Sequence, residues 1–299
     1  LSKNLYEIIK HMPKKSHPMD VARTAVSVMG LEDKETQDST PEANMRKALR
    51  IFAKTPTALA AFYRIRKGKK IIKPKKTLTF AENFFYMCFG KVPQKEIVKA
   101  FDVSLILYAE HSFNVSTFTA RTITSSLSDI HGAITGAIAS LKGPLHGGAN
   151  EEVMHMMNKI KKPENALKWI NNALKNKEVV MGFGHRVYKS GDSRVPTMRQ
   201  YFGKVAKLKK DKKFEKIYDI VEKVMIKEKN IHPNVDYPTG PTYHLMGFET
   251  DFFTPIFVIS RITGWSAHIM EQHAANKLIR PLASYKGSKH RKVLELNQR

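Results

Sequence analysis

Apolar residues recur every three to four positions along much of the chain, the spacing of helices that bury one face. The clearest stripe consists of Val98, Phe101, Leu105 and Tyr108. The same periodicity predicts amphipathic helices over residues 97–111, 166–174 and 214–229. Lysines fill the outer positions of the last two, which indicates solvated outer faces.

Two longer segments predict interior helices. Residues 117–141 are rich in Ala, Gly, Ser and Thr, which lets helix backbones approach closely, and we expect one helix that Gly143 and Pro144 end. Residues 252–271 are apolar nearly all round, as expected for a central helix. Only residues 179–181 look like a strand. The predicted fold class is therefore all-α.

Composition bounds the kind of protein. The chain has 299 residues, of which 42% are apolar, enough for a core and too many for a disordered chain. Lys and Arg number 51 against 27 Asp and Glu, a net charge of +24. This excess favours anions in general and does not choose among nucleic acid, phosphate, carboxylate and coenzyme A. The basic runs at 66–76, 159–162 and 207–216 lack interleaved aromatic residues, so we interpret them as solvated surface.

Cys88 is the single cysteine, which excludes an intrachain disulfide and a thiolate zinc cage. No run of 18 apolar residues occurs, so no membrane-spanning helix is predicted. The first residues do not read as a secretory signal. A reducing compartment, the cytoplasm, is the expected location.

The remaining histidine and glycine motifs do not predict a metal or dinucleotide site. His268 and His273 flank Glu271, but five residues rotate the second histidine by about 140° around a helix, away from the first. Residues 182–184 begin like a dinucleotide-binding loop, yet Val187 stands where the third glycine belongs. No metal ligand set and no prosthetic group are therefore predicted.

Two histidines lie in glycine-rich loops. His146 lies in GPLHGGAN, and His185 lies in MGFGHRVYKSGDSR, where Arg186, Lys189 and Arg194 follow. Glycines leave backbone N–H groups accessible, and nearby cations suit phosphate or carboxylate groups. Each histidine alone is equally compatible with a structural role. The shared context favours a ligand site.

Asp236 lies in HPNVDYPTG, among Pro233, Pro238 and Gly240, and we expect it in a loop. It could serve as a turn or capping residue, as aspartates commonly do. Alternatively it is a general base, because a desolvated carboxylate can remove a proton from carbon beside a carbonyl when a donor stabilises the oxyanion.

At these residues the sequence resembles the citrate synthase family, most closely the bacterial citrate/2-methylcitrate synthases. The matching stretches are residues 110–121, 141–154, 180–194, 233–240 and 254–281. They occur in family order over most of the chain. HPMDVARTAVS near the start is also similar to the family, although members normally place several tens of residues before it.

The resemblance implies that a short acyl-CoA condenses with oxaloacetate and that the thioester is then hydrolysed. It implies that Asp236 removes the proton next to the thioester carbonyl, that His146 hydrogen-bonds the carbonyl oxygen, and that His185 polarises the ketone of oxaloacetate. His111 and Arg194 match positions that hold oxaloacetate.

Further binding residues follow from the resemblance. Arg261, together with Arg280 from the partner subunit, would bind the carboxylates of oxaloacetate, for which bidentate arginine is suited. The positions that match the coenzyme A site are Val180, Met181, Gly182, Gly184 and Lys189.

The resemblance also implies a homodimer of two-domain subunits without a resident cofactor. Residues 1–146 and 248–299 would form a large helical domain, and residues 147–247 a small domain that closes over the site. Closure would protect the enolate from water.

The acyl group and the function class leave alternatives. The stretch DYPTGPTYHLMGF is closer to 2-methylcitrate synthases, which favours propionyl-CoA, while a dedicated citrate synthase would use acetyl-CoA. One methylene in an apolar pocket changes selectivity by only about 1–3 kcal/mol. From another class, the charge of +24 is compatible with a nucleic-acid-binding or inactive scaffold protein.

Overall fold

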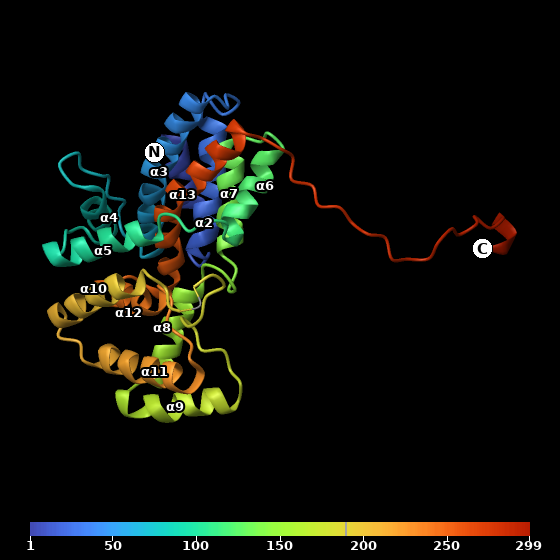
Figure 1. Ribbon diagram of the computed structural model, residues 1–299. Helices are drawn as coiled ribbons and strands as arrows, with labels where there is room; N and C mark the ends of the chain where they lie inside the picture. Colours follow the sequence, from blue (N-terminus) through green and yellow to red (C-terminus); the bar gives the residue numbers. More distant parts are fainter. Residues whose placement is uncertain (189) are drawn as a thin grey trace.

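The structure is a computed structural model that describes residues 1–188 and 190–299. The described residues form thirteen α-helices and two short 3-10 helices (Figure 1). The α-helices are α1 (Lys3–His11), α2 (Pro18–Glu32), α3 (Pro41–Arg66), α4 (Phe80–Phe89), α5 (Lys95–Tyr108), α6 (Val115–Ser125), α7 (Ile130–Leu141), α8 (Ala149–Ile160), α9 (Pro163–Lys175), α10 (Val195–Leu208), α11 (Lys213–Lys229), α12 (Asp236–Met246) and α13 (Phe253–Ala274). The 3-10 helices are η1 (Thr250–Phe252) and η2 (Leu296–Gln298). The all-α prediction is confirmed.

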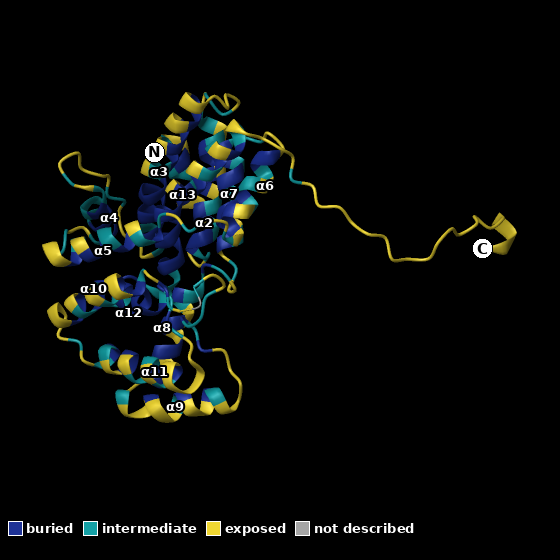
Figure 2. Cartoon of the chain, in the orientation of Figure 1, coloured by how far each residue is buried: buried dark blue, intermediate teal, exposed yellow. Residues whose placement is uncertain are grey.

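Helix α13 lies at the centre of the larger group of helices. It packs against α3, α5, α6 and α7, and Figure 2 shows it largely buried. Its Trp265 is fully buried. At Gly264 the helix approaches α5 so closely that a Cβ would lie 2.4 Å from the carbonyl oxygen of Ala109. The prediction of a central helix over residues 252–271 is confirmed, as are the helices predicted over 97–111, 166–174 and 214–229.

Helices α8 to α12 gather below this group in Figure 1. Within them α9 packs on α11, while α12 packs on both α8 and α10. They touch the larger group where α10 meets α5 and where α8 meets α13. The loops that carry His146 and His185 therefore lie near the line where the two groups meet.

Two predicted elements differ from the structure. Residues 117–141 form two helices, α6 and α7, because Asp129 caps a new helix by accepting hydrogen bonds from the N–H groups of His131 and Gly132. Leu127 adopts a φ of 65° just before this cap. Residues 179–181 do not form a strand; the nearest described extended pairing is a single bridge between Phe183 and Pro233.

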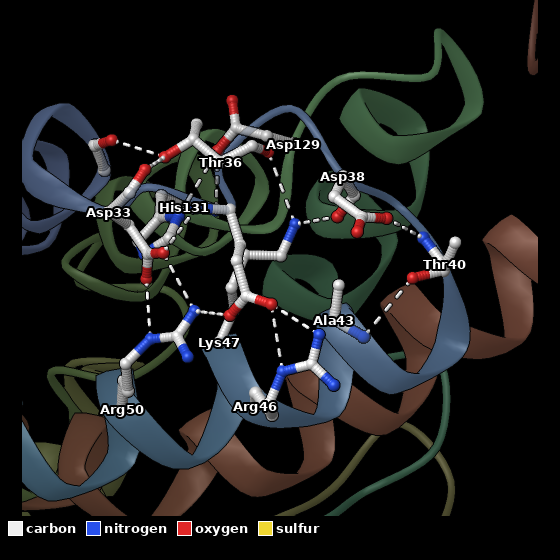
Figure 3. Close-up of polar contacts among 12 residues, drawn as sticks. Asp33, Thr36, Asp38, Thr40, Ala43, Arg46, Lys47, Arg50, Asp129 and His131 are labelled. Carbon is white, nitrogen blue, oxygen red and sulfur yellow. Dashed lines mark hydrogen bonds and ion pairs between the residues drawn. The ribbon is translucent and has the colours of Figure 1, made fainter.

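Helices α2, α3 and α7 meet at a polar network (Figure 3). Asp33 accepts two hydrogen bonds of 2.8 Å from Arg50, which also lies 2.7 Å from Glu35. The fully buried Lys47 donates to the carbonyl oxygens of Thr36 and Asp38. This network fixes the loop between α2 and α3.

Residues 275–299 leave the body as an extended arm (Figures 1 and 2). Its large apolar side chains Leu282, Tyr285 and Val293 are each at least 80% exposed. The start of the arm is fixed to the end of α6, since the N–H of Ile279 donates to Ser125 Oγ at 3.1 Å. Among the described helices, none combines the length and apolarity that crossing a membrane requires.

Candidate active site

Asp236 is the first residue of α12, and not a loop residue as the sequence suggested. The O–H of Tyr108, at the end of α5, donates to its Oδ1 at 2.5 Å. Burial raises the pKa of Asp236 to about 6, and the hydrogen bond from Tyr108 and the charge of Arg194 only partly oppose this rise. The carboxylate is thus more basic than an ordinary aspartate and remains ionised at neutral pH.

His146 is half-buried in the turn between α7 and α8. The backbone N–H of Ser116 donates to its Nε2 at 3.2 Å, and Ser116 Oγ lies 2.8 Å from the same nitrogen. Because Nε2 accepts, the proton of the neutral ring resides on Nδ1. Burial, followed by the charges of Arg261 and His111, lowers the pKa of His146 to about 4. The ring is a neutral donor at physiological pH.

His185 and His111 face each other with their Nε2 atoms 3.0 Å apart. The N–H groups of Val187 and Tyr188 donate to Nδ1 of His185, so its proton lies on Nε2. Burial, followed by the charge of Arg194, lowers the pKa of His111 to about 4, which suits an acceptor. The ring of Tyr188 stacks on His111, with centroids 5.3 Å apart, and holds the pair from one side.

Arg194 precedes α10 and is oriented by Asp192, whose side chain is fully buried. Asp192 accepts from Nε at 2.9 Å and from Nη2 at 2.8 Å. Burial lowers the pKa of Arg194, but the bonds to Asp192 and the negative charges of Asp192 and Asp236 together hold the pKa above its usual value. The same carboxylate accepts from the N–H of Val235, the residue before Asp236.

Arg261 on α13 is only 1% exposed. Its Nε donates to the carbonyl oxygen of Tyr108 at 2.7 Å. Burial, followed by the charge of Arg194, lowers its pKa to about 10, so the guanidinium remains charged at neutral pH. Within residues 1–188 and 190–299 it forms no ion pair, and such a buried cation attracts an external anion.

The backbone beside His185 contains the residues assigned to coenzyme A. The loop is paired with residues 232–234: the N–H of Gly184 donates to the carbonyl oxygen of His232, and the N–H of Asn234 to that of Gly182. Gly182 has a φ of +83°, and a Cβ there would lie 2.7 Å from Val153 and 2.9 Å from Tyr237. Only glycine fits this close approach.

The structure brings most of the predicted site residues together and leaves one apart. The group around Tyr108 and Asp236 comprises His111, His146, His185, Arg194 and Arg261, with Val180, Met181, Gly182 and Gly184 in the adjoining loop. Arg280 lies on the exposed arm, where its Nη1 donates to the carbonyl oxygen of Pro281. Lys189 lies outside the described residues.

Sequence reasoning missed Tyr108 and Asp192 as site residues. Tyr108 belongs to the predicted apolar stripe, and its hydroxyl at the end of a buried helix face, three residues before His111, is the available signal. Asp192 stands two residues before Arg194, a spacing at which a short loop permits a bidentate pair.

The histidines of α13 point to different partners. His268 Nε2 lies 2.9 Å from Glu110, whereas His273 faces Asn44 and Ser128. The described part of the chain contains no cluster of three or more His, Cys, Asp or Glu side chains suited to a metal ion.

Comparisons with known proteins agree with this geometry. The model of the citrate synthase C-terminal domain matches residues 1–282. The chain is 51% identical to a citrate synthase of Mycolicibacterium smegmatis over 98% of this chain and 78% of that protein. It is 51% identical to a 2-methylcitrate synthase of Mycobacterium tuberculosis over 97% of this chain and 74% of that protein.

A solved structure gives the same picture. The ternary complex of citrate synthase from Thermoplasma acidophilum with carboxymethyl coenzyme A and oxaloacetate has a TM-score of 0.91 and 32% identity, over all of this chain and 80% of that one. With nearly its whole length matched by the family model and by close relatives, this chain belongs to the citrate synthase family.

Proposed function

We propose that this protein condenses a short acyl-CoA with oxaloacetate and water to give 2-methylcitrate or citrate and free coenzyme A. Relatives named citrate synthase and 2-methylcitrate synthase share about half of its residues. The observation that carries the proposal is Asp236, a base of pKa about 6, held beside the partly buried Arg194 and the fully buried Arg261.

Asp236 takes the first step. Its carboxylate removes the proton from the carbon next to the thioester carbonyl, and the electron pair moves onto the carbonyl oxygen. A base with a pKa near 6 is stronger than an ordinary aspartate and still ionised at pH 7. The proton rests on Asp236 until product forms.

His146 stabilises the enolate oxygen as a neutral donor. Its Nδ1–H is the donor because Nε2 accepts from the N–H of Ser116. A pKa of about 4 keeps the ring neutral, so that it donates a hydrogen bond without a competing proton equilibrium. The Ser116 contacts also fix the orientation of the ring.

Oxaloacetate occupies the space between the histidine pair and the two arginines. Its ketone oxygen accepts from Nε2–H of His185 in place of His111 and takes up the proton as the new carbon–carbon bond forms. His111, Arg194 and Arg261 bind the rest of the molecule, the arginines through its carboxylates. Water then attacks the thioester carbonyl and returns a proton to Nε2 of His185. The thiolate leaves with the proton held by Asp236, as free coenzyme A.

The loop of residues 180–184 and Lys189 would receive coenzyme A. Residues 147–247 would move as a small domain against residues 1–146 and 248–299, since α8 to α12 pack mainly on one another. Closure would exclude water from the enolate. A decrease in the radius of gyration on adding oxaloacetate, measured by X-ray scattering, tests this movement.

A homodimer completes the proposal. Arg280 lies on the arm, away from its own site, and a partner subunit could receive it. The start of α6 exposes Phe113, Val115 and Phe118, each at least 50% exposed. Sedimentation should show a dimer that Phe118→Glu converts to a monomer, while Leu167→Glu on α9, equally exposed, leaves it intact. The cytoplasm stays the predicted compartment.

A free-thiol assay tests the reaction. Purified protein should release coenzyme A from propionyl-CoA or acetyl-CoA only when oxaloacetate is present. Asp236→Asn and His146→Ala should lose about 10²–10⁴-fold in rate with an unchanged circular dichroism spectrum. Asp102→Asn, an exposed aspartate on α5, serves as the control.

Two outcomes would overturn the proposal. If both Asp236→Asn and His146→Ala kept wild-type turnover, the roles assigned to these two residues would be wrong. A wild-type protein that releases no thiol but binds DNA in a salt-sensitive way would favour the nucleic-acid-binding alternative. The ratio of kcat/KM for propionyl-CoA and acetyl-CoA decides the preferred acyl group.

A further inference from the structure

The carboxylate of Asp192 occupies an unusual place between two parts of the site. Four donors surround it: Oδ1 accepts from the backbone N–H and the Nε of Arg194, at 3.0 and 2.9 Å, while Oδ2 accepts from Nη2 of Arg194 at 2.8 Å and from the N–H of Val235 at 3.0 Å. The side chain is fully buried. A buried carboxylate with all its lone pairs used is held in one orientation.

We propose that Asp192 is the positioning residue that sets Arg194 and Asp236 relative to each other. Oδ2 bonds both the guanidinium of Arg194 and the backbone of Val235, so one oxygen atom relates the substrate-binding cation to the first turn of α12. This inference rests on the proposed function, because it assigns Arg194 to oxaloacetate and Asp236 to proton removal.

A simple capping role does not account for these contacts. Asp192 does accept the N–H of Arg194 two residues on, as many loop aspartates do, and Asn or Ser would serve equally there. The bidentate ion pair and the bond to Val235, 43 residues away, need two ionised oxygens. Those two contacts distinguish positioning from capping.

The charge of Asp192 also acts on Asp236 directly. Its negative charge raises the pKa of Asp236, whereas the positive charge of Arg194 lowers it. Removing the charge at residue 192 therefore lowers the pKa of Asp236. It also leaves the positive charge of Arg194 uncompensated, which lowers the pKa of Asp236 further. The acidic limb of kcat/KM against pH should move to lower pH in Asp192→Asn.

The experiment measures kcat, KM for oxaloacetate, the pH profile and oxaloacetate binding by calorimetry for the wild type, Asp192→Asn and Asp192→Glu. Asp192→Asn should lose about 10²-fold in kcat/KM through both constants, bind oxaloacetate more weakly and show the shifted limb. Asp192→Glu keeps the charge but displaces Arg194, so KM should rise while the limb stays near that of the wild type.

Asp219→Asn is the matched control. Arg199 lies on α10, the helix that follows Arg194, and its Nη2 lies 2.8 Å from the carboxylate of Asp219. The side chain of Asp219 is exposed. Its loss should change neither KM nor the pH profile. Asp192→Asn and Asp219→Asn each remove the carboxylate that pairs with one arginine.

The outcomes separate this inference from the proposed function. If the wild type is active and Asp192→Asn has a normal KM and an unshifted acidic limb, the inference alone is overturned. A normal KM in Asp192→Glu has the same consequence. If Asp192→Asn does not fold, Asp192→Glu decides, and an unchanged KM there overturns the inference. A wild type that neither binds oxaloacetate nor releases thiol overturns both.

Discussion

Two buried polar regions of this molecule treat charge in opposite ways. At the junction of α2, α3 and α7, Asp33 faces Arg50. Burial raises the pKa of Asp33, but the bonds from Arg50, the bond from the N–H of Glu35 and the charge of Arg50 together hold the pKa below its usual value. At the candidate active site, burial raises the pKa of Asp236 to about 6, and Arg261 has no ion pair with a described residue.

The difference separates stability from function. Arg50 is paired with both Asp33 and Glu35 and gains little from an outside ion, so the network of Figure 3 is suited to holding helices together. An unpaired buried charge costs free energy in the empty protein and gains when a substrate of opposite charge arrives. Substitutions in the two regions should therefore change different observables.

Arg261→Met should give the largest effect, and on activity alone. Removing one partner of a buried charge pair with substrate costs about 2–5 kcal/mol, so kcat/KM should fall about 30- to 5,000-fold. The free energy of unfolding should stay within about 1 kcal/mol or increase, because a desolvated cation is replaced by an apolar chain of similar length. Urea unfolding and the thiol assay measure the two quantities. A stability loss above about 3 kcal/mol would place Arg261 with the structural network instead.

Asp33→Ala should do the reverse. Its side chain is 5% exposed, and its removal leaves Arg50 without its bidentate partner, so the free energy of unfolding should fall by about 3 kcal/mol. The folded fraction should keep wild-type kcat. Glu7→Ala, which breaks the exposed pair with Lys10, should cost less than about 1 kcal/mol. Equal losses in the two variants would contradict the comparison.

How much of this contrast the sequence predicts depends on the range of the contacts. The glycine-flanked His146 and His185 and the proline-bounded Asp236 are visible as local patterns. Tyr108 and Asp192 are not, because their bonds to Asp236 and Val235 span 128 and 43 residues. Only a packed fold decides that they meet.

The fold shows the same limit. Helix α13 is predictable because it is apolar nearly all round, a property that needs no knowledge of neighbours. The sequence does not predict the break between α6 and α7, since small residues continue on both sides of Leu127 and only the capping bonds of Asp129 reveal a new start. Competition between a helix and a cap is settled by hydrogen bonds rather than by hydrophobic spacing.

Stability against pH should sharpen the comparison with opposite signs. The side chain of His131, whose Nδ1 lies 3.6 Å from Oδ1 of Asp129, is the main cause that lowers the pKa of Asp129 to about 2, and the N–H groups of Gly132 and His131 add to it. Asp129 therefore stabilises the protein above its unfolded pKa near 4, and about 1–2 kcal/mol is lost as pH falls toward 2. The raised pKa of Asp236 acts the other way, so its destabilising contribution at neutral pH disappears as pH falls from about 6 to 4.

The two contributions are isolated by difference. The unfolding free energy of wild type minus that of Asp129→Asn should fall with acidification below pH 4. The same difference for Asp236→Asn should rise between pH 6 and 4. Parallel slopes for the two aspartates would mean that both are paired alike.

Tyr108→Phe should give the smallest effect and the most specific one. The hydroxyl of Tyr108 donates to Asp236 and lowers its pKa, so its loss should raise that pKa further. The acidic limb of kcat/KM, expected near pH 6 in the wild type, should move up by about one pH unit, consistent with a hydrogen bond to a charged group of about 1.5 kcal/mol. Ser104→Ala is the control and should leave the limb in place. Ser104 lies on α5, as Tyr108 does, and its buried hydroxyl is bonded to that of Tyr243 on α12. Because Asp192→Asn shifts the limb to lower pH and Tyr108→Phe to higher pH, the two variants bracket the base, and a limb that moves in neither would show that another group limits the rate.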